Sequence, residues 1–180
     1  MPVKNVNFSN PNSGQFVSKF SPDLNNLLYS TTFGSGRGYP DIAPSAFLVD
    51  VCGNVYVSGW GGSTNDGSWS DGTLTKDLPI TKDAYQKESQ DGSDFYLIVF
   101  RKGIDSVLYA SYFGGPKSGE HVDGGTSRFD KRGMVYQSVC GGCHGNSDFP
   151  VTDNAWSKTN NSFRGCNNAF FKIKLDVANE

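Results

Sequence analysis

Cysteine is the residue type that offers the most chemistry in this chain. The four cysteines are Cys52, Cys140, Cys143 and Cys166, and a glycine lies next to each of them. An even number of cysteines in Gly-rich surroundings is typical of an exported protein with one or two disulfides. Four cysteines allow three complete pairings, and the sequence does not choose among them. We therefore predict disulfide bonding within this set.

The stretch Cys140-Gly-Gly-Cys143-His144 also has the ligand types of a metal site. Zinc takes about four Cys or His ligands, and Cys-x-x-Cys is a common half of such a site. Only Cys166 could add to it, because no second Cys-x-x-Cys or His-x-x-x-His pattern is present. A thioredoxin-type motif is disfavoured, since that motif opens a helix and no helix is indicated here. The sequence favours disulfides and predicts no metal, with reduced thiols and a metal site as the alternatives.

Asp-Gly steps recur in the chain, at 66–67, 71–72, 91–92 and 123–124. Calcium takes six to eight oxygen ligands, and a loop that holds Asp66, Asp71 and Asp77 would supply some of them. Asp-Gly is also the ordinary pair of a β-hairpin turn, and the EF-hand pattern Asp-x-Asp-x-Asp-Gly is absent. The sequence therefore predicts turns and no cofactor, with calcium as the alternative.

Three tryptophans, Trp60, Trp69 and Trp156, are candidates for ligand contact. Trp69 lies in a polar segment, and aromatic faces bind both sugars and apolar partner groups. Trp60 ends a predicted strand and precedes two glycines, whereas Trp156 aligns with an aromatic residue in an internal repeat and is interpreted as a packing residue. We predict Trp69, Trp60, Asp66 and Asp71 as ligand-binding residues, with local packing of Trp69 as the alternative.

No arrangement of residues in the sequence predicts catalysis. His121 and His144 are the only histidines, and no Gly-x-Ser-x-Gly pattern supplies a nucleophile for either of them. We interpret His121 as a surface residue. No pair of carboxylates stands out for sugar hydrolysis, because most Asp residues fall in turns and Glu88 and Glu120 fall in expected loops. The sequence therefore predicts a protein that is not an enzyme and that has no catalytic residue.

The composition indicates an all-β protein. Gly occurs 22 times in 180 residues, Ser, Asn and Asp are also frequent, and Glu occurs only three times. Turn formers are thus abundant and good helix formers are scarce, which argues against a helical bundle or a coiled coil. Aromatic residues make up 13% of the chain, which is enough to build a core and argues against a disordered tail.

Charge and hydropathy exclude two classes of partner. The formal net charge is -2 and no basic stripe is present, so we expect no nucleic-acid binding. No run of 18 or more apolar residues occurs, so we expect no membrane span. Residues 1–14 are polar and lack the basic start and apolar stretch of a signal peptide. We expect a fragment of a longer secreted or cell-surface protein, without its signal peptide, and a cytoplasmic chain is the alternative.

An internal repeat determines the predicted architecture. Residues 28–34, Leu-Tyr-Ser-Thr-Thr-Phe-Gly, align at an offset of 80 with residues 108–114, Leu-Tyr-Ala-Ser-Tyr-Phe-Gly. Farther along, residues 76–85 align with residues 147–156 at an offset of 71. The first copy therefore carries nine extra residues, which fall in the polar segment 61–75. Such a segment indicates an insertion in a surface loop.

Each copy of the repeat has the pattern of short strands joined by turns. Residues 95–100, Phe-Tyr-Leu-Ile-Val-Phe, are apolar on both faces, which predicts a central strand that is covered on both sides. The predicted strands are 16–20, 27–33, 46–49, 55–59, 95–100, 106–113, 128–130, 134–139 and 169–175. Four strands per copy, in antiparallel units that follow one another along the chain, are typical of β-propeller blades.

The repeated runs resemble the bacterial seven-bladed β-propeller repeat family. The resemblance rests on Leu-Tyr-Ser-x-x-Phe-Gly at 28–34, Val-Asp-x-x-Gly-Asn-Val-Tyr-Val-Ser-Gly at 49–59 and Asp-Phe-Pro-Val-Thr at 148–152, and it extends over about residues 16–175. Residues 119–130, with the Cys-Gly-Gly-Cys stretch after them, are also similar to segments of large surface proteins of gliding Bacteroidetes. Two repeats are too few to close a ring, so the resemblance implies a partial propeller.

The predicted fold is therefore all-β, with about two four-stranded antiparallel β-propeller-like blades. The predicted parts are a polar N-terminal segment (1–14), a first blade-like repeat (15–93) with the insertion 61–75, a second repeat with a closing strand (94–177), and a tail (178–180).

The resemblance implies a non-enzymatic interaction or structural module of a large secreted or cell-surface bacterial protein, serving adhesion, gliding or matrix building. Its expected partners are other blades or chains of the same protein, together with glycans or cell-surface proteins. The first alternative is a carbohydrate-binding, lectin-like module that uses Trp69 and the Asp-rich loop, assisted by calcium. The second alternative is a fragment of a propeller enzyme, such as a glycosidase or lyase, whose site lies in other blades.

Overall fold

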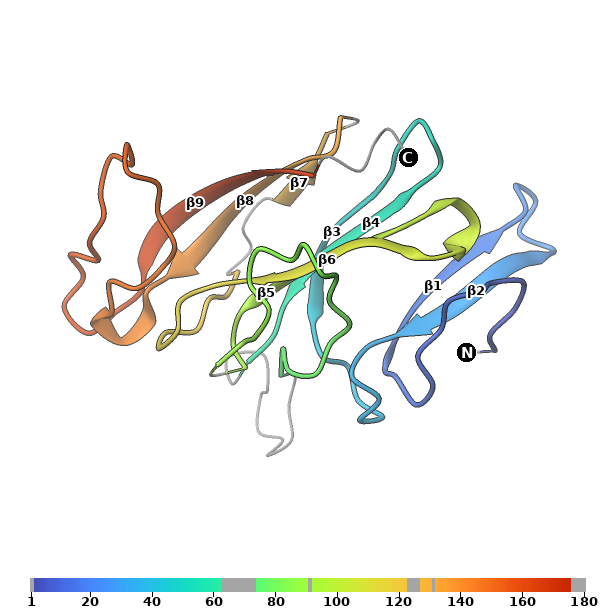
Figure 1. The fold of residues 1–180 in the computed structure, drawn as a ribbon, viewed down its shortest axis with the longest axis horizontal. Coiled ribbons are helices and arrows are strands. Elements are labelled where there is room, and N and C mark those ends of the chain that lie inside the picture. The colour runs from blue at the N-terminus through green and yellow to red at the C-terminus, as the bar shows by residue number, and fades with distance from the viewer. Residues whose placement is uncertain (1, 63–73, 91, 123–126, 131, 176–180) are drawn as a thin grey trace.

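The computed structural model describes residues 2–62, 74–90, 92–122, 127–130 and 132–175, and their strands form three antiparallel sheets (Figure 1). Sheet A pairs β1 (Gln15–Phe20) with β2 (Leu27–Phe33). Sheet B has the order β3 (Ala43–Val49), β4 (Val55–Trp60), β5 (Phe95–Phe100) and β6 (Val107–Phe113). Sheet C has the order β7 (Ser127–Phe129), β8 (Met134–Gly141) and β9 (Asn167–Lys174).

The all-β prediction is confirmed, since the described residues contain these strands and two short 3-10 turns, η2 (Lys102–Ile104) and η3 (Cys143–Gly145), but no α-helix. Each predicted strand is present, with ends that differ by at most three residues; β3 differs most, because it begins at Ala43 instead of residue 46. The boundary predicted between the two repeats, at residues 93 and 94, falls inside sheet B. The sheets are therefore out of phase with the sequence repeat by two strands.

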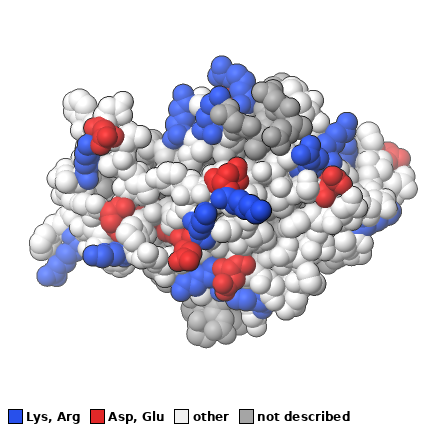
Figure 2. Space-filling view, in the orientation of Figure 1, with Lys and Arg blue, Asp and Glu red and all other residues white. Residues whose placement is uncertain are grey.

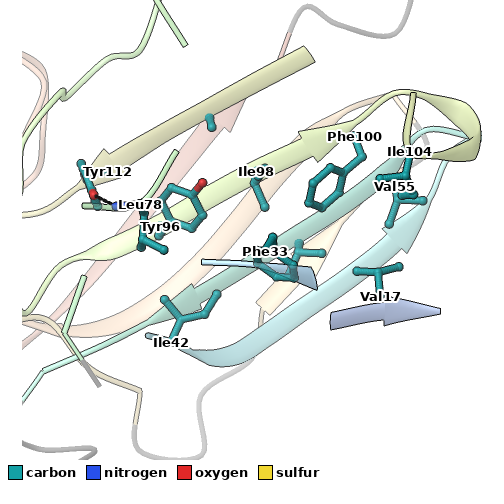
Figure 3. Close-up of a cluster of buried hydrophobic side chains, with 12 residues drawn as sticks. Val17, Phe33, Ile42, Val55, Leu78, Tyr96, Ile98, Phe100, Ile104 and Tyr112 are labelled. Atoms are coloured by element: carbon teal, nitrogen blue, oxygen red, sulfur yellow. Dashed lines mark hydrogen bonds between the residues drawn. The ribbon is translucent and has the colours of Figure 1, made fainter. Parts of the chain in front are cut away.

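Sheet B lies between the other two sheets and has a hydrophobic core on each face. Toward sheet A, the side chains of Tyr96, Ile98 and Phe100 on β5 meet Val17 and Phe33 (Figure 3). Toward sheet C, the alternate residues of β5 meet a second cluster from β8 and β9 that includes Val139 and Phe171. All six residues of β5 are buried, which confirms the predicted central strand covered on both sides. Alternate side chains of a strand point to opposite faces, so an all-apolar strand needs a neighbour on each.

The N-terminal segment continues sheet A as an irregular neighbour of β2. Lys4 forms a β-bridge with Ser30, and the Asn10 amide donates a hydrogen bond of 2.9 Å to the Thr32 carbonyl. The ring of Phe8 packs 5.6 Å from the ring of Phe100, centroid to centroid. The predicted polar segment therefore covers one edge of the core.

The β3–β4 and β7–β8 hairpins turn in the same way, 80 residues apart. Asp50 accepts hydrogen bonds from the amides of Cys52 and Asn54, at 2.8 and 2.9 Å. Asp130 accepts the matching bonds from Arg132 and Met134, at 2.8 and 3.1 Å. The glycines Gly53 and Gly133 have φ of 89° and 76° in these turns, a conformation that a side chain disfavours. The sequence repeat is therefore also a repeat of local structure.

Strand register gives the equivalent positions in sheets B and C. Trp60 lies opposite Phe95 in the β4–β5 pair, and Cys140, 80 residues after Trp60, lies opposite Asn168 in the β8–β9 pair. Asn168 therefore takes the place of Phe95, and Phe170 takes the place of Leu97. In sheet B, the face that carries Leu97 is covered by sheet C. In sheet C, the equivalent face carries Phe170, and Phe170 is exposed.

Basic and acidic side chains are interspersed over the face of the molecule shown in Figure 2, without a large area of one sign. Mixed charges of this kind create no strong single-sign field over this face. In the described part of the chain, no helix has the length and apolar character that crossing a membrane requires.

Candidate binding cleft and neighbouring buried polar groups

Of the four residues predicted to bind a ligand, Trp60 alone lies in the described part of the chain. Trp69, Asp66 and Asp71 lie outside the described residues. Trp60 is half-buried at the end of β4, where it packs against the core between sheets B and C. Its ring centroid lies 5.9 Å from that of His121. Trp60 therefore contributes to packing at the edge of the core.

A cleft of about 440 Å³ lies at the outer edge of sheet C. The connection 146–160 forms one wall, and the first residues of β9, 167–170, form the other. Trp156 and Phe170 bring aromatic surface to the cleft, and the Trp156 side chain is fully exposed. Trp156 was interpreted from the sequence as a packing residue, and its full exposure contradicts that interpretation.

The corresponding connection in sheet B, residues 76–86, lies against β6, the strand next to β5. The Leu78 amide donates to the Tyr112 hydroxyl at 2.8 Å, and the Thr81 amide donates to the Ala110 carbonyl at 3.1 Å. The ring of Tyr85 packs 5.5 Å from the ring of Phe113. The connection therefore holds the fourth strand by backbone bonds, a side-chain hydroxyl and an aromatic contact.

The same elements are present around the cleft in sheet C. At the offset of 71, Phe149, Thr152 and Trp156 match Leu78, Thr81 and Tyr85. The local turn is also the same, since the Ala155 amide donates to Thr152 at 3.0 Å, just as the Ala84 amide donates to Thr81 at 3.1 Å. Within the described residues, sheet C ends at β9. The cleft therefore occupies the position that β6 has in sheet B.

A buried carboxylate lies in each of the loops that leave β2 and β6. In the first loop, Asp41 accepts a hydrogen bond from the Ser35 amide at 2.9 Å and pairs with the Arg37 guanidinium at 2.5 Å. In the second loop, Glu120 accepts a hydrogen bond from the Gly115 amide at 3.1 Å and another from the Ser118 hydroxyl at 3.3 Å. Both carboxylates hold the turn after their strand.

The two carboxylates differ in the charge beside them. Arg37 offsets the charge of Asp41, but Glu120 lies near the buried carboxylate Asp94. Burial, and then the repulsion by Asp94, raise the pKa of Glu120 to about 9. Glu120 is therefore protonated at neutral pH. The sequence reasoning missed this group, because Glu120 sits in a loop and its burial comes from packing of that loop.

The cysteines divide into one disulfide and two thiols. Cys143 and Cys166 form the disulfide, while Cys52 is exposed in a turn and Cys140 is half-buried in β8. His121, interpreted from the sequence as a surface residue, is buried, and its Nδ1 lies 3.6 Å from Cys143 Sγ. A disulfide is typical of an oxidising, extracellular environment.

The strongest candidate for a binding site is thus the cleft beside β9, and the sequence signal for it was the repeat itself. Aligning 147–156 with 76–85 pairs Trp156 with Tyr85, but only the structure shows that Trp156 lacks the neighbour that Tyr85 has. Comparisons with protein-family models, with curated proteins and with solved structures find no match for this chain.

Proposed function

We propose that this chain is a non-enzymatic interaction and structural module of a larger secreted or cell-surface protein, and that it joins its partners by taking up a further β-strand at the edge of sheet C. The observation that carries the proposal is the cleft between Trp156 and β9, at the place where sheet B has its fourth strand.

The edge of sheet C has the properties of a strand-accepting surface. An edge strand presents backbone N–H and C=O groups that can pair with an added strand, and pockets for alternate side chains then give specificity. β9 supplies the backbone groups, and the aromatic cleft supplies a pocket beside it. The partner that fits best is a strand of the β6 type, with the pattern Leu-Tyr-x-x-x-Phe-Gly.

The outer face of sheet A supports assembly with units of the same kind. Phe16 and Phe20 on β1 are exposed, although the residues 80 positions later, Tyr96 and Phe100, are buried in the core of sheet B. Exposed aromatic residues at positions that are core elsewhere in the repeat favour packing against another sheet. We therefore propose propeller-like blades, whose partners are other blades or chains of the same protein.

The biological setting proposed for this module is adhesion, gliding or matrix building at a bacterial surface. It is supported by the sequence resemblance and by the Cys143–Cys166 disulfide, which suits an oxidising environment.

A peptide with the sequence of residues 106–115 tests the strand-accepting edge. Trp156 is exposed beside the cleft, so we expect saturable binding at one site with a change in tryptophan fluorescence. Trp156→Ala should weaken binding, measured calorimetrically, whereas Phe163→Ala should not, because Phe163 is equally accessible but does not line the cleft.

The backbone contribution is tested by the same peptide with proline at the position of Ser111. Proline has no N–H and is not tolerated inside a paired strand, so binding should be lost. Absence of binding by the first peptide, or equal binding by both peptides, would contradict the proposal.

A carbohydrate-binding function is the second candidate, because the cleft combines aromatic surface with the amide side chains of Asn167 and Asn168. Aromatic faces stack on sugar rings, and amides both donate and accept hydrogen bonds. A glycan array probed with and without a calcium chelator tests it. Binding that Trp156→Ala abolishes and Phe163→Ala preserves would support this candidate, and an array without binding would remove it.

A further inference from the structure

Three residues from separate parts of the sequence bring metal-ligating atoms together beside sheet C. The Nδ1 or Nε2 atom of His121 and the Sγ atoms of Cys143 and Cys166 all lie within 4.8 Å of one another. His121 and Cys143 are buried. None of the three residues lines the cleft described above, although Gly142 and Asn167, the neighbours of Cys143 and Cys166 in the sequence, do line it.

The spacing of the nitrogen and sulfur atoms matches that of zinc ligands. In a tetrahedral site with Zn–S bonds of about 2.3 Å and Zn–N bonds of about 2.0–2.1 Å, a sulfur and a nitrogen ligand lie about 3.5 Å apart. His121 Nδ1 and Cys143 Sγ lie 3.6 Å apart. The two sulfur atoms, now bonded to each other, would have to separate to admit an ion.

Backbone hydrogen bonds hold the segments that carry these residues. His121 and Cys140 are bridge partners, joined by bonds of 2.9 and 3.3 Å. The η3 turn carries Cys143, and its Gly145 amide donates to the Gly165 carbonyl at 3.0 Å, next to Cys166. The three segments therefore stay close together when the disulfide is opened.

Cys140 is the natural source of a fourth ligand. It precedes Cys143 in a Cys-x-x-Cys spacing, which is common in zinc sites. Its thiol is half-buried and is not part of the disulfide. Neither Cys140 nor His144 is among the clustered residues, so the Cys140 thiol has to turn toward the cluster to bind the ion.

We propose that reduction of the Cys143–Cys166 disulfide converts this cluster into a zinc site with His121, Cys143, Cys166 and Cys140 as ligands. A dithiol or phosphine reductant supplies two electrons, the S–S bond breaks, and each sulfur takes up a proton. On binding Zn²⁺ the three thiols release their protons as thiolates, and neutral His121 coordinates through Nδ1. The segments that carry Cys143 and Cys166 are thus held together either by a disulfide bond or by a metal ion.

Titration with Co²⁺ tests the proposal, since cobalt in a tetrahedral thiolate site gives intense visible absorption. Protein reduced by a phosphine, with metal removed and oxygen excluded, should bind one Co²⁺ per chain with sulfur-to-cobalt charge-transfer bands. Zn²⁺ should displace the cobalt. Protein with its disulfide intact should not give this spectrum.

Two matched pairs of variants distinguish the ligands. His121→Ala should lower the affinity by at least about tenfold, whereas His144→Ala should leave it unchanged. Cys140→Ser should lower the affinity, and Cys52→Ser should not. Each variant is first compared with the parent chain by circular dichroism in the oxidised form, where the disulfide supports the fold.

A rescue variant removes the ambiguity of a folding defect. His121→Cys replaces one zinc ligand by another, so tetrahedral cobalt absorption should return, with added sulfur-to-cobalt intensity. Absence of stoichiometric cobalt binding in the reduced parent chain would overturn the proposal, as would an equal loss for His144→Ala and His121→Ala. An unchanged affinity for Cys140→Ser would remove Cys140 from the ligand set.

Discussion

Sheets B and C are built from the same succession of strands, yet sheet B has four strands and sheet C, among the described residues, has three. Both contain the same Asp-centred hairpin turn and the same register between the second and third strands. Sheet B has β6 beside β5, and a neighbouring sheet on each face. Sheet C has neither a strand beyond β9 nor a sheet on its outer face among the described residues.

The difference shows that the place of a strand among the packed sheets, more than its local sequence, determines which of its side chains form a core. Leu97 and Phe170 occupy equivalent positions in register, but Leu97 is 1% exposed and Phe170 is 76% exposed. β9 also carries Lys172 at the position where β5 has the apolar Val99.

The comparison predicts a large difference in stability at these two equivalent positions. Leu97→Ala should lower the free energy of unfolding by about 2–5 kcal/mol, because it leaves a cavity in a core that is closed on both sides. Phe170→Ala should change it by less than about 0.5 kcal/mol in the isolated chain, because the Phe170 ring is mostly exposed. Urea unfolding followed by circular dichroism measures both.

If Phe170→Ala lowered the free energy of unfolding by several kcal/mol, the prediction would be contradicted, because the outer face of sheet C would then be covered in solution. In that case self-association, measured by analytical ultracentrifugation, should disappear in the variant.

The second prediction concerns the loops that leave sheets A and B, with Asp41 in one and Glu120 in the other. The Glu120 pKa is raised from 4.5 to about 9 in the folded chain, so between these pH values the native state binds one more proton than the unfolded state. Stability should therefore fall as the pH rises through this window, by up to about 1.4 kcal/mol per pH unit. Glu120→Gln, which resembles the protonated acid, should remove this slope.

Urea unfolding at several pH values between 5 and 9 measures the effect, and the variant should exceed the parent chain in stability most at the alkaline end. Asp41→Asn is the matched control, because it should destabilise by separating Asp41 from Arg37 without removing the slope. An identical pH dependence in the parent chain and Glu120→Gln would show that Glu120 is already ionised in the folded protein.

The smallest predicted effect is a difference in stability between variants of the two hairpin turns. Asp50 is buried and also accepts a hydrogen bond from the Tyr56 hydroxyl at 3.0 Å, whereas Asp130 lies at the surface. Asp50→Ala should cost about 1–3 kcal/mol, because it leaves the buried Tyr56 hydroxyl without its acceptor. Asp130→Ala should cost less, since water replaces its bonds. Thermal unfolding of both variants checks the order, and the reverse order would contradict it.

Much of the fold could be predicted from local sequence, as residues 95–100 illustrate. Their continuous apolar run predicted a strand covered on both sides, and β5 is such a strand. Binding residues were harder to predict, because exposure of an aromatic residue depends on what packs against it. Trp156 was interpreted from the sequence as a packing residue, yet it is exposed. Trp60 was predicted to bind a ligand, yet it lies against the core.

The sequence by itself determined the strands, the turns and their recurrence, because hydrophobic alternation and the chemistry of Asp and Gly in turns act over a few residues. The tertiary structure was needed to show that, among the described residues, β9 has a neighbouring strand on one side, that Glu120 is buried near another carboxylate, and that His121 instead of His144 lies beside Cys143. These features join residues that are distant in the sequence, and they depend on the order in which the sheets pack.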